Sequence, residues 1–531
     1  MTRAIERPVA VITDSVDSPR NSWLKWAIAL TVSLGAILEV IDTSIVNVAL
    51  IDMQGSLGAT LSEIGWVITG YAIANVIIIP LSAWLGDYFG RKTYFIFSLI
   101  AFTLASVLCG LSVNLPMLIF ARILQGLGGG GLLAKAQAIL FETFPREEQG
   151  VAQALFGVGV IAGPAIGPTL GGYLTDTLGW RWIFFINIPF GILAVVMAWI
   201  FLPKPAAAYR NRTVDWLGIF LLIVGLAGLQ TMLEEGQKDD WFSSSFIVAM
   251  AVIGIGGLSL FIWRELTTEH PAVDLRILRF PSLAAGSIYS MVLGMGIYGA
   301  LFAVPIFTQS VLHFTAMQTG LLLLPGALTS AAMMVLMGKA TRWFDPRFLI
   351  LTGGLITVAV MFSLTHLNPQ TGTEELFWPL IWRGAGTVMM FLPLSLATLG
   401  PLPKEFISAG SGLYNLTRQL GGSIGIALLT TLLAQREAFH RTILVESVSL
   451  YNHATTQRLD QLSGALFTQG IDLAMSHTQA LKLIDQLINT QAAILSFEDI
   501  FRVVGIMFIG SLPLVFFLGR PSGEQSIPSE H

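Results

Sequence analysis

Two acidic residues in an apolar stretch near the N-terminus are the clearest candidates for a chemical role in this sequence. Glu39 and Asp42 fall within a stretch predicted to be a helix at 25–48. Residues three apart share one helix face. A charge near the centre of a bilayer costs at least roughly 2.5–3.5 kcal/mol on insertion scales, so such residues usually serve a function. The chemistry that this pair predicts is the binding and release of a proton.

Arg122 is the predicted counterpart of these acids. Asp42 and Arg122 each lie within about eight residues, or roughly 12 Å, of the outer ends of their stretches at 25–48 and 116–141. The two side chains therefore share a depth. A guanidinium beside two carboxylates gives the acids different proton affinities, so one can exchange a proton near neutral pH. The alternative is a structural ion pair that fixes the first helix against the fourth.

The elements that must position these residues are fourteen apolar stretches that fill most of the chain. A hydrocarbon core of roughly 30 Å needs about 20 helical residues to span it. The lipid offers no hydrogen-bond partners, so a span must be a helix or part of a closed barrel, and these stretches are too long for barrel strands. We therefore predict an all-α polytopic membrane protein with 14 transmembrane helices at 25–48, 64–85, 93–113, 116–141, 150–174, 182–203, 214–234, 243–263, 282–310, 318–338, 348–367, 376–400, 405–433 and 494–519.

The composition supports a membrane protein and argues against several other classes. The chain is 54% hydrophobic and 12% charged, whereas soluble proteins carry about 25% charged residues. The net charge of −4 gives no reason to expect a nucleic-acid partner. The sequence has no G-x-x-x-x-G-K-[ST] phosphate loop, no H-E-x-x-H and no G-x-S-x-G frame. We expect neither an enzyme nor a cofactor or metal site, and a non-transporting sensor or scaffold is the less favoured alternative.

The distribution of cations predicts the orientation. With a cytoplasmic N-terminus, the inside segments hold 18 of the 29 Lys and Arg residues and the short outside loops hold two. By the positive-inside rule both termini are cytoplasmic. One outside segment, 434–493, is long and carries leucines at helical spacing (Leu459, Leu462 and Leu466). We expect short amphipathic helices there, which form either a packed cap on the outer face or a docking surface.

A weak internal repeat predicts two related halves. The loop at 86–92, after the second span, is echoed by 338–345, after the tenth. Parallel repeats of this kind place a substrate site between the halves near the midplane. The predicted domains are a tail at 1–22, a six-helix half at 23–203, two linker helices at 204–280, a second six-helix half at 281–519 that includes 434–493, and a tail at 520–531.

Three further groups of residues are candidates for conformational roles. The short loop after the second span can lock one state, or it can serve only as an orientation signal, through Gly86, Asp87, Gly90, Arg91 and Lys92. A bare glycine stripe lets another helix approach closely, and prolines permit a bend, which suits a helix that rocks against the other half or one that packs statically. Its members are Gly159, Gly163, Pro164, Gly167 and Gly171.

The third group is a polar cluster in apolar spans. It consists of Asn415, Arg418 and Gln419 in the thirteenth span, with Gln125 in the fourth. Such a cluster has no place against lipid, so we predict a cavity or gating role; the alternative for Arg418 is a hydrogen-bond donor in helix packing. Lys135 is a further cation deep in the fourth span, and a long side chain there can snorkel toward an interface.

These residues stand in segments that resemble the major facilitator superfamily, and within it the fourteen-span drug:proton antiporter family of the EmrB/QacA type, closest to the EmrB branch. The resemblance covers nearly the whole chain. Its segments are Leu38 to Ala49, Gly86 to Lys92, Arg122 to Gly126, Gly159 to Gly172, Trp182 to Pro189, Asp240 to Ser244, Val273 to Leu275 and Asn415 to Arg418.

The resemblance implies secondary active efflux of lipophilic or amphipathic small molecules in exchange for protons, by alternating access in a bacterial inner membrane. It also implies a periplasmic adaptor protein and an outer-membrane channel as partners. Asp42 and Arg122 would serve coupling, Asp87 and Arg91 locking, and Gly163 and Pro164 the antiport direction. Glu39 and Lys135 depart from the family pattern. An exporter of an endogenous glycolipid, saccharide or siderophore-like metabolite is the alternative function.

Overall fold

The structure is a computed structural model, and it describes residues 22–203, 214–449 and 451–519. The predicted tails at 1–22 and 520–531 lie outside the described residues, apart from Ser22, as does the segment 204–213. The described residues contain helices and no strands, which confirms the all-α fold class.

We describe the helices in three consecutive groups, which follow the predicted halves and linker. The first group (the N-half) contains α1 (Ser22–Val48), α2 (Leu50–Leu57), α3 (Leu61–Phe89), α4 (Arg91–Gly110), α5 (Leu115–Gly129), α6 (Leu132–Thr143), α7 (Arg146–Leu178), α8 (Trp182–Phe185) and α9 (Asn187–Phe201). The linker contains α10 (Trp216–Glu235), η1 (Trp241–Ser243), α11 (Ser245–Thr267) and η2 (Leu275–Arg279).

The second group (the C-half) follows the linker. It contains α12 (Pro281–Ile306), the π-helical η3 (Phe307–Val311), α13 (Ala316–Ala340), α14 (Pro346–Ser363), α15 (Thr373–Leu399), η4 (Lys404–Phe406), α16 (Ile407–Glu446), α17 (His453–Thr468), α18 (Leu473–Ser511) and η5 (Leu512–Phe517).

The number of candidate membrane spans is lower than predicted when helices are selected by length and apolar composition. Among the described residues twelve helices can cross a membrane, or thirteen if the bent helix α7 is one span. The predicted span at 405–433 is missing from this set. It corresponds to the first part of α16, where Asn415, Arg418 and Gln419 lower the apolar character. The count of fourteen therefore stays a prediction that depends on α16.

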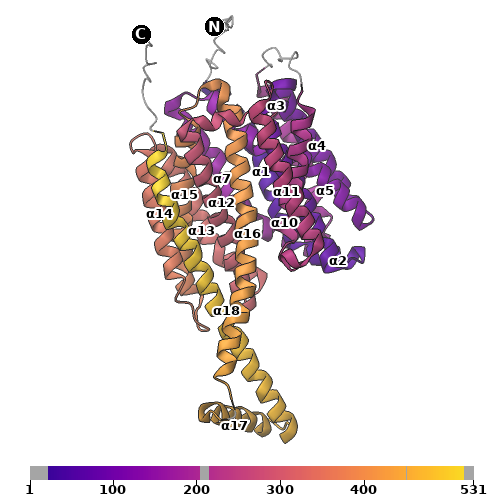
Figure 1. The fold of residues 1–531 in the computed structure, drawn as a ribbon, viewed down its shortest axis with the longest axis vertical. Helices are drawn as coiled ribbons and strands as arrows, with labels where there is room; N and C mark the ends of the chain where they lie inside the picture. The colour runs from indigo at the N-terminus through magenta and orange to yellow at the C-terminus, as the bar shows by residue number, and fades with distance from the viewer. Residues whose placement is uncertain (1–21, 204–213, 450, 520–531) are drawn as a thin grey trace, which may run out of the picture.

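The helices form an upright bundle with a long projection at one end (Figure 1). We call the end where α1 begins the terminal end, and the opposite one the arm end. The helices α16 and α18 continue beyond the arm end, and α17 lies at the tip of this projection (Figure 1). We call residues 434–493 the arm. The arm extends away from the bundle rather than covering it as a cap, and only α17 is the short helix that the leucine spacing predicts.

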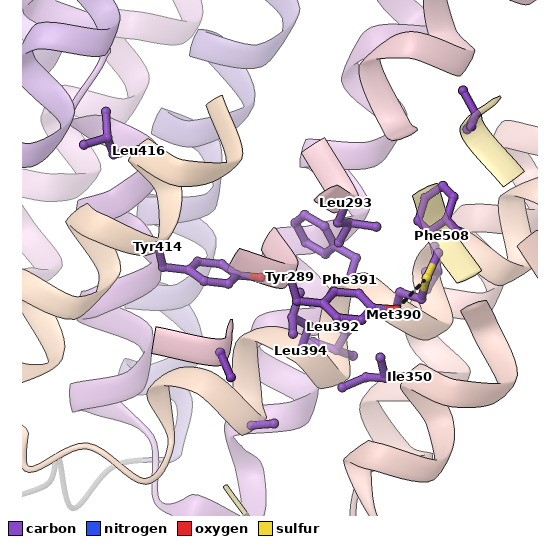
Figure 2. Close-up of a cluster of buried hydrophobic side chains, with 14 of the residues drawn as sticks. Tyr289, Leu293, Ile350, Met390, Phe391, Leu392, Leu394, Tyr414, Leu416 and Phe508 are labelled. Atoms are coloured by element: carbon purple, nitrogen blue, oxygen red, sulfur yellow. Dashed lines mark hydrogen bonds between the residues drawn. The ribbon is translucent and has the colours of Figure 1, made fainter. Parts of the chain in front are cut away.

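Each half has a dense apolar interior. In the C-half, Tyr289 and Leu293 of α12 pack with Met390 and Phe391 of α15 and with Phe508 of α18 (Figure 2). The Tyr289 hydroxyl donates to Met390 Sδ at 3.5 Å. By contrast, large apolar side chains on the outer faces are exposed. Exposed apolar surface on long apolar helices is expected to face lipid; the exposed side chains include Phe97, Leu104, Trp199, Phe220, Ile255 and Trp263.

Candidate functional site

The predicted pair Asp42 and Arg122 forms a buried ion pair in the N-half. Arg122 Nη1 lies 2.6 Å from Asp42 Oδ2, and the two side chains are 1% and 0% exposed. They come from α1 and α5, and the side-chain pair bridges these two helices. Removing one partner of such a buried pair typically costs about 3–5 kcal/mol because the other charge is left unpaired. The pair therefore holds α1 and α5 together as long as Asp42 is ionised.

Two amides complete the coordination of the Asp42 carboxylate. Gln125 Nε2 and Asn187 Nδ2 both donate to Asp42 Oδ1 at 2.8 Å. Asn187, at the start of α9, also donates to Ser106 Oγ at 3.1 Å. Asp42, Arg122, Gln125 and Asn187 form what we call the acid–guanidinium network. We predicted a role for Gln125 but missed Asn187, although an amide in an otherwise apolar helix was a usable signal.

Arg122 has further partners that fix its orientation. Its Nε donates to the carbonyl of Val67 at 3.2 Å, and its Nη1 donates to Gln125 Oε1 at 2.8 Å. The guanidinium also lies 4.1 Å from the centre of the Tyr71 ring. These three contacts come from α3 and from Arg122's own helix, α5. The guanidinium thus stays satisfied in part if the Asp42 carboxylate becomes neutral.

Glu39 is not part of this network, although it shares a helix face with Asp42. Its carboxylate accepts from Asn75 Nδ2 at 2.9 Å and from the backbone N–H of Leu133 at 3.0 Å. Leu133 lies in the first turn of α6, where backbone N–H groups have no partner inside the helix. This helix start exists because the chain breaks between α5 and α6 at a run of glycines. A carboxylate is favoured at such a helix N-terminus.

The glycine stripe of α7 packs against α1 of its own half. A Cβ on Gly159 would lie 2.1 Å from Ile37 Cγ1, one on Gly163 2.7 Å from Val40 Cγ1, and one on Gly167 1.9 Å from Ser44 Oγ. The predicted close approach is present. Its partner is α1, the helix that carries Glu39 and Asp42.

Another face of α7 meets the C-half. A Cβ on Gly150 would lie 2.4 Å from Oγ1 of Thr341, the residue that follows α13, and one on Gly157 would lie 2.6 Å from Met334 Cε in α13. The parts of α7 on the two sides of Pro164 meet at 48°. This bent helix therefore lies between α1 and α13, where it can relay a movement of α1 to the C-half.

The loop motif between α3 and α4 is held together by ion pairs within the N-half. Arg91 Nε lies 3.9 Å from Asp87 Oδ1, and Arg91 also pairs with Glu142 of α6. Lys92 Nζ donates to the carbonyls of Trp199 and Leu202 at 2.6 and 2.7 Å. Gly90 has φ +87°, a left-handed conformation that favours glycine. The structure thus brings the predicted motif residues together, with Glu142 as a partner that we missed.

A polar contact between α6 and α16 joins the halves toward the terminal end. Asn415 Nδ2 donates to Gln137 Oε1 at 2.8 Å, and Ser411 Oγ donates to the carbonyl of Ala134 at 2.8 Å. Lys135 Nζ donates to Ser408 Oγ at 2.8 Å. We call these six residues the seam. Arg418, buried beside it, donates to Asn415 Oδ1 at 2.5 Å, whereas Gln419 is half-buried and has no hydrogen bond in the described network.

The linker helix α10 contacts both halves, which the sequence did not suggest. Thr69 of α3 donates to Glu235 Oε1 at 2.6 Å, and Gln230 Nε2 donates to Ser423 Oγ of α16 at 2.7 Å. Trp241 Nε1 donates to Thr431 Oγ1 at 2.9 Å. These contacts explain why the segment at 240–244 has a defined position against α16.

A bundle of two helical halves, with a charged network buried in one half and a polar seam between them, defines a membrane transporter. The known proteins agree. The profile of the Major Facilitator Superfamily matches residues 32–426. The chain is 36% identical over 496 residues, 93% of its length and 95% of the relative's, to multidrug export protein EmrB of Escherichia coli strain K12.

Other relatives and solved structures lead to the same family. The chain is 33% identical to the fatty acid resistance protein FarB of Neisseria gonorrhoeae, covering 94% of this chain and 97% of that one. The proton:xylose symporter XylE has the same fold, with a TM-score of 0.60 at 13% identity over 93% of this chain and 96% of that chain. The protein belongs to the major facilitator superfamily and, within it, to the EmrB branch. It is a multi-pass membrane transporter and not an enzyme.

Proposed function

We propose that this protein is a proton-driven multidrug exporter of the bacterial inner membrane, which releases lipophilic or amphipathic small molecules in exchange for protons. The observation that carries the proposal is the acid–guanidinium network, because an ionisable carboxylate buried in a transporter is a natural proton site. The printed names of the relatives, multidrug export protein and fatty acid resistance protein, support export of such compounds.

The mechanism begins at Asp42. A proton on this carboxylate removes the charge that pairs with Arg122, while Gln125, Val67 and Tyr71 continue to hold the guanidinium. The attraction between α1 and α5 falls, so α1 can shift. Because the glycine stripe of α7 lies against α1 and another face of α7 lies against α13, the shift reaches the C-half. Opening of the seam would then expose the space between the halves to the terminal side.

The orientation follows from the cations. We assign the terminal end to the cytoplasm and the arm end to the periplasm, since the predicted inside segments hold 18 of the 29 Lys and Arg residues. In this orientation the seam closes the cytoplasmic side, and the pairs that Arg91 makes with Asp87 and Glu142 secure the helices beside it. We propose that these pairs lock that state.

Transport in everted membrane vesicles tests the function. With an imposed pH gradient, vesicles that contain the protein should accumulate a fluorescent lipophilic dye, and vesicles without it should not. Collapse of the gradient should abolish accumulation. Dye transport that survives full collapse of the pH gradient, with no other ion gradient present, would contradict proton coupling. The absence of any dye flux would contradict the export function.

We further propose that the arm docks a periplasmic adaptor protein that leads to an outer-membrane channel. The arm is internally braced, because Arg441 donates to Asn489 at 2.7 Å and to Asp485 at 2.9 Å, and His440 contacts Asp499 at 2.9 Å. It also exposes apolar side chains that neither the bundle nor lipid would cover, namely Ile443, Tyr451, Phe467, Met475 and Leu487. Such exposed apolar surface is typical of interaction sites.

This docking proposal predicts a separation of two activities. Replacing three exposed apolar residues of the arm together, Ile443, Phe467 and Met475, with serine should leave dye transport in vesicles within about twofold, because the acid–guanidinium network is untouched. Drug resistance of intact cells should fall at least about tenfold if the adaptor needs this surface. Equal loss of both activities would point to misfolding, and unchanged resistance in cells would contradict the docking role. The matched control replaces Leu104, which faces outward from α4, with serine.

A further inference from the structure

Lys135 is a buried cation that the proposed mechanism does not use. It lies in α6 and is 2% exposed. Its Nζ donates to Ser408 Oγ of α16 at 2.8 Å and lies 3.5 Å from the carbonyl oxygen of Ala83 in α3. The side chain thus crosses the seam from the N-half to the C-half. Its polar contacts at this position are made with neutral oxygens.

The loop motif provides the space for this amine. A Cβ on Gly86 would lie 2.3 Å from Lys135 Nζ and 2.7 Å from its Cε. The space that the Lys135 amine occupies is therefore open because Gly86, the first glycine of the motif, has no side chain. We call this space the notch. Asp87 follows Gly86 directly, so a carboxylate is attached next to the notch.

In the part of the chain that the structure describes, Asp87 and Glu142 act on Lys135 only from beyond ion-pair distance. Among the described residues, no acidic oxygen lies within 4.0 Å of Lys135 Nζ, whereas Asp87 and Glu142 both pair with Arg91. Glu142 Oε1 is buried and has no hydrogen bond. An ammonium group can donate three hydrogen bonds, and a buried charge without a counter-charge destabilises the state that buries it. The closed seam therefore contains a cation that has no carboxylate at ion-pair distance, and one oxygen of Glu142 nearby has no hydrogen bond.

We propose that Lys135 promotes opening of the seam between α6 and α16. In the closed seam the ammonium is confined among neutral oxygens. When α16 moves away, water reaches the notch and the ammonium can turn to Asp87. Lys135 is thus a positioning residue that raises the energy of the closed state relative to the open one. This inference rests on the proposed function, since it assigns a role in alternating access.

Two substitutions at the two ends of one hydrogen bond distinguish this role from a simple latch. Lys135→Met keeps most of the length of the side chain and removes the charge, so the ratio of open to closed seam should fall about tenfold, as expected when an unpaired buried charge is replaced by an apolar group. Ser408→Ala removes a hydrogen-bond acceptor of the ammonium, so the closed state becomes less favourable and the ratio of open to closed seam should rise. A latch would give a rise for both variants, and inert packing would give no change for Lys135→Met.

The ratio is measured as a distance distribution between spin labels, on full-length protein in detergent or nanodiscs. Glu147→Cys at the start of α7 and Glu405→Cys in η4 provide exposed label sites in the two halves, and the native Cys109 is buried. This readout needs no transport, so a failure of the proposed drug export leaves it intact. An unchanged or increased open fraction in Lys135→Met, with normal thermal stability, overturns the proposal.

Discussion

Asp42→Asn should abolish proton-driven export while the protein remains inserted in the membrane. Asparagine keeps the size of the side chain and its hydrogen bonds to Gln125 or Asn187, but it cannot bind and release a proton. The initial rate of dye accumulation in everted vesicles under a pH gradient should fall at least about hundredfold, the range expected when a residue essential to the reaction is removed. The amount of protein in the membrane, measured by immunoblot, should change little.

Asp52→Asn is the matched control for this prediction. Asp52 is exposed in the first turn of α2, so the same chemical change there should leave the rate within about twofold. Export by Asp42→Asn at more than a tenth of the wild-type rate, still dependent on the pH gradient, would show that another group carries the proton. Glu39 is the first to test in that event, because its carboxylate is buried with separate partners one helical turn away.

Gly167→Val should have the second large effect, because it removes the close contact between α7 and α1. A Cβ at this position would lie 1.9 Å from Ser44 Oγ and 3.1 Å from the backbone nitrogen of Ile45. The backbone cannot yield as a flexible side chain can, so α1 must move away from α7. Overpacking of this kind typically costs about 1–3 kcal/mol. Dye transport should fall at least about tenfold, and the melting temperature should fall as well.

The same substitution at Gly256 controls for the loss of a helical glycine. A Cβ on Gly256 in α11 would meet nothing within 4 Å, so Gly256→Val should retain normal transport and stability. Normal transport in Gly167→Val would mean that contact between α1 and α7 is not needed for the relay. If stability falls but the remaining folded protein still transports dye, the glycine stripe serves only static helix packing.

The sequence predicted those features that follow from transfer into lipid or from local chain properties. The apolar stretches matched helices closely, since burying a helix in lipid depends on composition over about 20 residues. Asp42 and Arg122 were paired correctly because helix direction and depth can be counted along the chain. Close approach at the glycine stripe was also predictable, because four bare positions on one face leave room for a neighbour.

Features that depend on tertiary partners could not be predicted in the same way. The helix that fills the glycine stripe, the separation of Glu39 from Arg122, and the contacts of Asn187 and Glu142 depend on how helices are arranged around one another. The break between α5 and α6 was visible only as a glycine run, and its role at Glu39 needed the fold. The contacts of α10 with both halves had no local signal, since Gln230 and Glu235 look like ordinary polar residues near the end of a helix.

The continuity of α16 and α18 through the bundle and into the arm has a mechanical consequence. From Leu473 to the predicted start of the last span at 494, α18 rises about 31 Å at 1.5 Å per residue. If the C-half tilts by about 10° during the transport cycle, simple geometry moves the tip sideways by about 5 Å over this length. A protein attached at α17 would then be displaced once in each transport cycle. Movement of the C-half inside the membrane can therefore coordinate the drug pathway outside it.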